Sequence, residues 1–143
     1  MKQKLLLTLI VACIGMSGCG NTSAKKNHVQ PHENGVEVLY FHGKQRCATC
    51  VAIEKNTRKV VESEFAEELQ NGTLIFRVVD ITKPQNTELA DKYEITWSSL
   101  VVVKYEDGKE QAENLTTFAF ANARNNPDTF CSELTDKLKK LLE

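Results

Sequence analysis

The sequence predicts one α/β domain in which a mixed β-sheet is covered by helices on both faces. Two observations support this prediction. Short segments rich in β-branched and aromatic residues alternate with amphipathic segments whose apolar residues recur every three or four positions. An Asp107-Gly108 pair predicts a tight hairpin late in the chain. Alternation of strands and helices in this way requires a sheet with helices packed on its two faces.

The elements are expected in the order strand, long helix, strand, short helix, hairpin, helix. The first strand covers 36–42, and the apolar stripe that follows predicts one long helix over 48–69, ended by Asn71-Gly72. Later elements are strands over 74–79, 100–105 and 109–115, with a short helix over 87–93 after Pro84. Asn126-Pro127 opens the last helix, whose buried stripe is Phe130, Leu134, Leu138 and Leu141.

The first twenty residues are typical of an export signal. Lys2 and Lys4 precede an apolar stretch over 5–16, which is too short to span a bilayer but fits a secretory signal. Met16-Ser17-Gly18-Cys19 follows and resembles a bacterial lipobox, so we expect Cys19 to carry a lipid. A lipobox ending at Cys13 and plain cleavage without a lipid are the alternatives.

The predicted organisation is therefore a signal peptide at 1–18, a flexible tether at 19–35 and a folded domain at 36–143. The tether is polar and has no apolar periodicity. We expect the mature protein to be anchored by its lipid to a bacterial membrane, on the periplasmic side or at the cell surface. The 18 basic and 19 acidic residues argue against nucleic acid as a partner, because no basic excess is available to neutralise phosphates.

Cys47 and Cys50 stand three residues apart, at the start of the long predicted helix. The free N–H groups and the dipole of a helix N-terminus stabilise a thiolate, so the pKa of Cys47 should lie below the value of a free cysteine. Lys44 and Arg46 add positive charge with the same effect. Cys50, one turn further on, could attack a mixed disulfide on Cys47 and release the product.

The strand, the Cys47-Ala48-Thr49-Cys50 motif and the element order resemble the thioredoxin superfamily over about 36–142. The stretch "YEITWSSLVVVKYEDGKE", 93–110, is similar to the thioredoxin segment that runs through a substrate-binding loop into the hairpin. This resemblance implies a thioredoxin-like fold and a redox-active Cys47–Cys50 disulfide, with Cys47 attacking and Cys50 resolving. It also implies that Trp97, Ser98 and Ser99 form the substrate loop.

Three departures from the thioredoxin pattern bear on the site. The position of the thioredoxin cis-proline falls on Ser99, where we expect a trans peptide bond because the cis form is costly without proline. The position of the buried thioredoxin aspartate falls on Tyr40 or Phe41, which leaves His42 as the nearest candidate for a proton relay. The residues between the cysteines are Ala-Thr rather than Gly-Pro, and no tryptophan precedes the motif.

Two alternatives compete with a redox dithiol. A zinc site needs four ligands, and beyond the pair the domain offers only His42 and Cys131. A structural disulfide that spans two residues stabilises little, because it closes a very short loop. We expect Cys131 to be a buried, inert thiol beside the stripe of the last helix.

The sequence thus favours a membrane-tethered, extracytoplasmic thiol–disulfide oxidoreductase that acts on protein thiols and disulfides. The Ala-Thr pair lacks the histidine that strong oxidants tend to have, so we favour a reductase supplied by an electron donor in the membrane. We expect no cofactor. A second hypothesis is a protein that binds a soft metal or metalloid, such as copper or arsenite, through Cys47, Cys50 and His42. A third is an interaction module without turnover.

Overall fold

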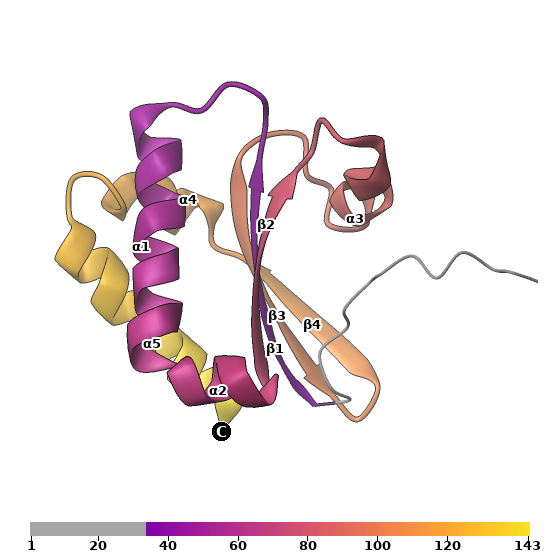
Figure 1. Ribbon diagram of the computed structural model, residues 1–143, viewed down its shortest axis with the longest axis vertical. Helices are drawn as coiled ribbons and strands as arrows, with labels where there is room; N and C mark the ends of the chain where they lie inside the picture. The colour runs from indigo at the N-terminus through magenta and orange to yellow at the C-terminus, as the bar shows by residue number, and fades with distance from the viewer. Residues whose placement is uncertain (1–33) are drawn as a thin grey trace, which may run out of the picture.

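A mixed β-sheet forms the centre of the computed structural model, which describes residues 34–143 (Figure 1). In these residues the strand order is β2-β1-β3-β4. The central strand β1 (Gly35–His42) runs parallel to β2 (Leu74–Asp80) and antiparallel to β3 (Ser99–Glu106), which pairs with β4 (Lys109–Asn114). The predicted signal peptide, the lipidation site at Cys19 and most of the tether lie outside the described residues.

Helices cover both faces of the sheet, as predicted. One face carries α1 (Ala48–Glu64), α2 (Ala66–Asn71), α4 (Thr116–Asn122) and α5 (Pro127–Leu142), whereas α3 (Thr87–Lys92) lies against the other face after the 3₁₀ turn η1 (Pro84–Asn86) (Figure 1). Alternate residues of β1 face the two layers. Val36, Val38 and Tyr40 belong to the apolar cluster beneath α1 and α5, and Leu39 and Phe41 belong to the cluster beneath α3.

The prediction of one long helix over 48–69 is wrong in one respect, because the helix breaks at Phe65. There the backbone leaves the helical region, with φ −132° and ψ 33°, and α2 begins one residue later. The Phe65 side chain is only 2% exposed and packs in the cluster beneath α1 and α5. The break therefore turns the chain while a large apolar side chain stays in the core. Gly72 ends α2 with φ 79°, in the left-handed conformation that its place in the sequence predicted.

Helix α4 was not predicted, and tertiary contacts explain its position. The Oδ1 atom of Asn114 accepts a hydrogen bond from the N–H of Thr116 at 2.9 Å. The Oγ1 atom of Thr116 accepts one from the N–H of Leu100, on β3, at 3.1 Å. The first turn of α4 is thus tied to the sheet by residues that are sixteen positions apart in the chain.

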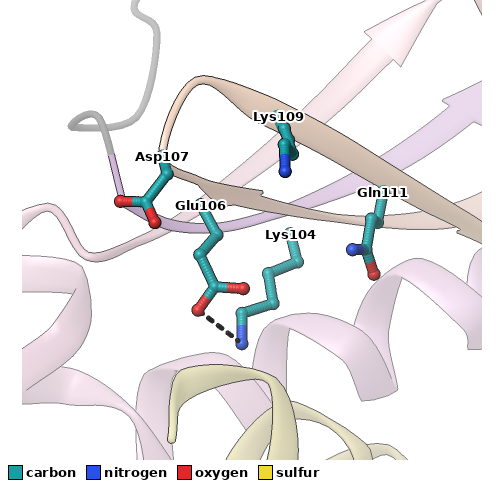
Figure 2. A pocket seen from close by; sticks show the side chains of 5 residues that line it. All are labelled: Lys104, Glu106, Asp107, Lys109 and Gln111. Carbon is teal, nitrogen blue, oxygen red and sulfur yellow. Dashed lines mark ion pairs between the residues drawn. The ribbon is translucent and has the colours of Figure 1, made fainter.

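The two ends of the sheet differ in character. At one end β1 leads into α1, and the segment before β3 lies beside it. At the other end β3 and β4 form the predicted hairpin, whose turn residues Asp107 and Gly108 have φ values of 51° and 72°. The hairpin bears a charged hollow in which Lys104 and Glu106 form an ion pair at 3.5 Å (Figure 2).

No helix within 34–143 has the length and apolar character needed to cross a membrane.

Candidate active site

Cys47 is the N-cap residue of α1 and Cys50 lies in the first turn. The backbone of Cys47 is extended, with φ −72° and ψ 166°, and its Sγ atom accepts a hydrogen bond from the N–H of Cys50 at 3.1 Å. Cys47 is exposed, whereas Cys50 is only 6% exposed, and both are free thiols in the structure. The pair therefore combines an accessible sulfur atom with a shielded one.

Local hydrogen bonds lower the pKa of the Cys47 thiol. The largest cause is a hydrogen bond from the Cys50 side chain, followed by the backbone N–H groups of Cys50 and Thr49. A thiolate at this position thus has donors already in place at the start of the helix. The predicted direction of the shift agrees with the structure, and its main source is the first turn of α1 itself.

The two cations that precede the pair have different surroundings. Lys44 is exposed in the segment between β1 and α1. The guanidinium group of Arg46 forms an ion pair with the carboxylate of Glu54 on α1, and lies over the ring of Tyr40, 5.5 Å from its centroid. Although burial raises the pKa of Glu54, hydrogen bonds and charge from Arg46 and Arg58 outweigh it and lower that pKa. Arg46 is thus engaged with Glu54 and Tyr40, and its predicted effect on the charge of Cys47 stays a prediction.

Tyr40 is a site residue to which the sequence assigned no role of its own. It is fully buried in β1, and its hydroxyl group donates a hydrogen bond to the backbone carbonyl of Cys50 at 2.8 Å. Burial raises the pKa of this phenol, while interactions with Arg46 and Ser98 oppose the rise. Tyr40 belongs to the cluster on the α1 side of the sheet, whereas its neighbour Phe41 belongs to the cluster on the α3 side.

His42 lies at the end of β1, on the same side of the strand as Tyr40. Its Nδ1 atom is 2.9 Å from the carbonyl oxygen of Gly43, and its ring stacks on that of Tyr40 with centroids 6.1 Å apart. These contacts orient the imidazole at the edge of the site. Its role as a proton relay stays a prediction.

The segment Trp97-Ser98-Ser99 lies beside the end of β1, because Ser99 pairs with Phe41 in the sheet register. Ser98 and Ser99 are buried, and the Ser99 hydroxyl donates to the carbonyl of Trp97 at 3.1 Å. Trp97 itself is 57% exposed and leans on Phe120 of α4, with ring centroids 5.2 Å apart. Within 34–143 there is no cis peptide bond, so Ser99 follows a trans bond as expected. The structure thus places the predicted substrate loop next to the dithiol end of the sheet.

Cys131 and the metal hypothesis are the remaining predictions for the site. Cys131 lies on α5 and is half-buried rather than buried, and desolvation raises the pKa of its thiol. It borders a hollow between α1 and α5, together with Lys59 and Ser63. Among residues 34–143, no group of three or more His, Cys, Asp or Glu side chains is arranged to hold a metal ion. In this part of the chain, neither His42 nor Cys131 is thus gathered with the cysteine pair into such a group.

Comparisons with known proteins gave structural neighbours only. No family model matches the chain, and no curated protein does. A thioredoxin from Fasciola hepatica is 23% identical, covering 73% of this chain and 81% of its own, with a TM-score of 0.44. A thioredoxin from Thermus thermophilus is 17% identical over 71% of this chain and 72% of its own, with a TM-score of 0.45. An uncharacterised thioredoxin-like protein from Clostridium perfringens is 17% identical over 80% and 90%, with a TM-score of 0.43.

These distant likenesses add nothing about activity, and the fold is assigned from the structure itself. A central β1 pairs in parallel with β2 and antiparallel with β3, and helices cover both faces of the sheet. The cysteine pair begins the helix that follows the central strand. The chain accordingly has a thioredoxin-like α/β fold with a Cys-x-x-Cys pair at the N-terminus of α1.

Proposed function

We propose that this protein is a thiol–disulfide oxidoreductase in which Cys47 is the nucleophile and Cys50 the resolving thiol. The observation that carries the proposal is the asymmetry of the pair. Cys47 is exposed, has a lowered pKa and accepts hydrogen bonds from the first turn of α1. Cys50 is shielded from solvent, and its backbone N–H donates to Sγ of Cys47 at 3.1 Å. An accessible thiolate beside a resolving thiol is what disulfide exchange requires.

The proposed reduction proceeds in two exchange steps. The Cys47 thiolate attacks one sulfur atom of the substrate disulfide, a bond forms between the two sulfur atoms, and the other substrate sulfur leaves as a thiolate that takes up a proton. The Cys50 thiol then loses its proton and attacks Sγ of Cys47. This step releases the second substrate thiol and leaves a Cys47–Cys50 disulfide. Two electrons have passed from the protein dithiol to the substrate.

We further propose that the protein works as a reductase of protein disulfides, held at the outer side of a bacterial membrane by a lipid on Cys19. The lipobox-like Met16-Ser17-Gly18-Cys19 supports the anchor, and the absence of a histidine between the two active-site cysteines supports the direction of electron flow. In an oxidising compartment the dithiol must be regenerated, so the proposal includes a membrane-bound dithiol or quinol-linked electron donor. The lipid would keep the site close to that donor.

Trapping of mixed disulfides tests the assigned roles. In Cys50→Ser the resolving step is lost, so disulfides between Cys47 and client proteins should accumulate on non-reducing gels. Cys47→Ser should lose both trapping and turnover of a model disulfide. Cys131→Ser is the matched control, because it removes a half-buried thiol on α5 and should keep wild-type turnover. Equal trapping by the Cys47 and Cys50 variants, or loss of turnover in the Cys131 variant, would contradict the proposal.

A further inference from the structure

We propose that Tyr40 is a positioning residue for the dithiol, and that its hydroxyl group helps to set the equilibrium between the dithiol and the Cys47–Cys50 disulfide. The inference rests on the proposed function for its biological meaning. It assigns a task to a side chain whose hydroxyl group bonds to the backbone of Cys50 and acts on the sulfur atoms through it.

The first argument is the sequence of hydrogen bonds that links Tyr40 to the nucleophile. The Tyr40 hydroxyl donates to the carbonyl oxygen of Cys50 at 2.8 Å, and the N–H of the same Cys50 donates to Sγ of Cys47 at 3.1 Å. Tyr40 thus holds the residue that holds the nucleophilic sulfur atom. Because Tyr40 is fully buried in the central strand, its hydroxyl is a fixed point from which the first turn of α1 is positioned.

The second argument is that the Tyr40 ring is itself held in place. The guanidinium group of Arg46 covers it at 5.5 Å from the centroid, which is within the range of a cation–π contact. Glu54 fixes that guanidinium group through an ion pair. The segment between β1 and α1, the strand and the helix therefore converge on one hydroxyl group. Packing alone would be served equally well by phenylalanine, so the structure uses the hydroxyl for the contact to Cys50.

The direction of the effect follows from the state that these contacts favour. The ordered first turn presents its donors to the Cys47 sulfur atom, which stabilises the reduced form with a thiolate. A dithiol whose reduced form is stabilised is a weaker reductant. Removal of the Tyr40 hydroxyl leaves the Cys50 carbonyl without this buried donor and loosens the turn. Tyr40→Phe should therefore make the dithiol a stronger reductant and make the Cys47 thiol harder to ionise.

The test is Tyr40→Phe in the full chain, measured at equilibrium with glutathione. Reduced protein and glutathione disulfide give protein disulfide and two molecules of glutathione, so atoms and electrons balance. We expect the equilibrium constant to rise threefold to tenfold, which is a potential more negative by roughly 15 to 30 mV for a two-electron couple. The pH profile of Cys47 alkylation by iodoacetamide should move to higher pH. Thermal unfolding reports whether the fold is kept.

Tyr105→Phe is the matched control. Its hydroxyl also makes an internal hydrogen bond, to the carboxylate of Glu37 at 3.1 Å, but on the face of the sheet that carries α3. This variant should leave both the glutathione equilibrium and the alkylation profile of Cys47 unchanged. An equal shift in the two variants would show a general effect of stability and would overturn the inference.

A second variant, Arg46→Lys, keeps the positive charge but removes the planar group above the Tyr40 ring. It should shift the equilibrium in the same direction by about twofold, and it decides the question if Tyr40→Phe does not fold. No shift in the folded variants refutes the inference. If the wild-type protein does not reduce clients and Cys50→Ser does not trap them, while Tyr40→Phe still shifts both readouts, the proposed function fails and the positioning role stands. If Tyr40→Phe keeps normal turnover and both readouts are unchanged, the positioning role fails and the proposed function stands.

Discussion

The Cys47 sulfur atom caps α1, so its replacement should affect stability in a way that depends on the substituent. Its Sγ atom accepts the hydrogen bond from the N–H of Cys50 at 3.1 Å, and α1 has no acidic residue in its first turn to supplement this cap. Serine offers an oxygen acceptor at the same position, whereas alanine offers none. Loss of an N-cap acceptor costs about 1 kcal/mol. We therefore expect Cys47→Ala to be less stable than Cys47→Ser by about 1 kcal/mol, or about 4 °C in Tm for a domain of this size.

The lowered pKa of Cys47 predicts, in addition, that the stability of the reduced protein depends on pH. Since hydrogen bonds from Cys50 and Thr49 lower the pKa of Cys47 in the folded state, the unfolded chain binds more protons between the folded and unfolded pKa values. This contribution to the stability of the reduced protein is fully present above the unfolded pKa and is lost as pH falls through the folded pKa. Neither Cys47→Ser nor Cys47→Ala can show it. The advantage of the wild-type protein over Cys47→Ser should therefore grow as pH rises.

Urea denaturation under reducing conditions, at several pH values from acidic to mildly alkaline, measures both effects. Cys131 and Cys50 are kept in all three proteins, so their own titration is common to the series. Equal stability of the serine and alanine variants would refute the capping role. A difference between wild type and Cys47→Ser that does not change with pH would refute the lowered pKa.

Two further predictions concern stability away from the dithiol. The Oγ1 atom of Thr57, which is fully buried on α1, has no hydrogen-bond partner among the described residues. Thr57→Val should therefore raise the free energy of unfolding by about 1 kcal/mol. A lower free energy of unfolding in urea denaturation would contradict this. The carboxylate of Glu37 is buried and bound by Arg77 at 2.8 Å, so Arg77→Met should cost about 3 kcal/mol by the same assay. Lys92→Met, which breaks an exposed pair with Glu110, should cost less than about 1 kcal/mol, and equal losses would count against the argument.

The order of strands and helices could be predicted because it depends on local patterns. Apolar runs and the Asp107-Gly108 turn marked the strands, and the stripe of Phe130, Leu134, Leu138 and Leu141 marked α5. The first three of these side chains are buried as expected, whereas Leu141, near the end of the helix, is only partly buried. Such patterns involve residues only a few positions apart, so they can be recognised without knowledge of the fold. The end of the helical region at Gly72 belongs to the same class of local signal.

The break at Phe65 and the existence of α4 could not be predicted in this way. The periodic stripe over 48–69 continues through Phe65, but in the structure α1 ends there while the Phe65 side chain packs in the core beneath α1 and α5. Helix α4 contains threonine and phenylalanine, which favour strands as readily as helices, and its start depends on a bond to Leu100. Both features involve tertiary contacts, which a local sequence pattern does not reveal.

By itself, the sequence determined the local chemistry of the site. It places two thiols one helical turn apart, with the first at the start of a helix, where the Cys50 side chain and then the backbone N–H groups lower the pKa of Cys47. Only the tertiary structure decided what surrounds them. It placed the Tyr40 hydroxyl against the Cys50 carbonyl, turned Arg46 toward Glu54, and brought Ser99 beside Phe41. The physical reason is range, because helix capping acts within one turn of the chain. The direction in which a buried side chain points is set by strand register and by packing against segments far away in sequence.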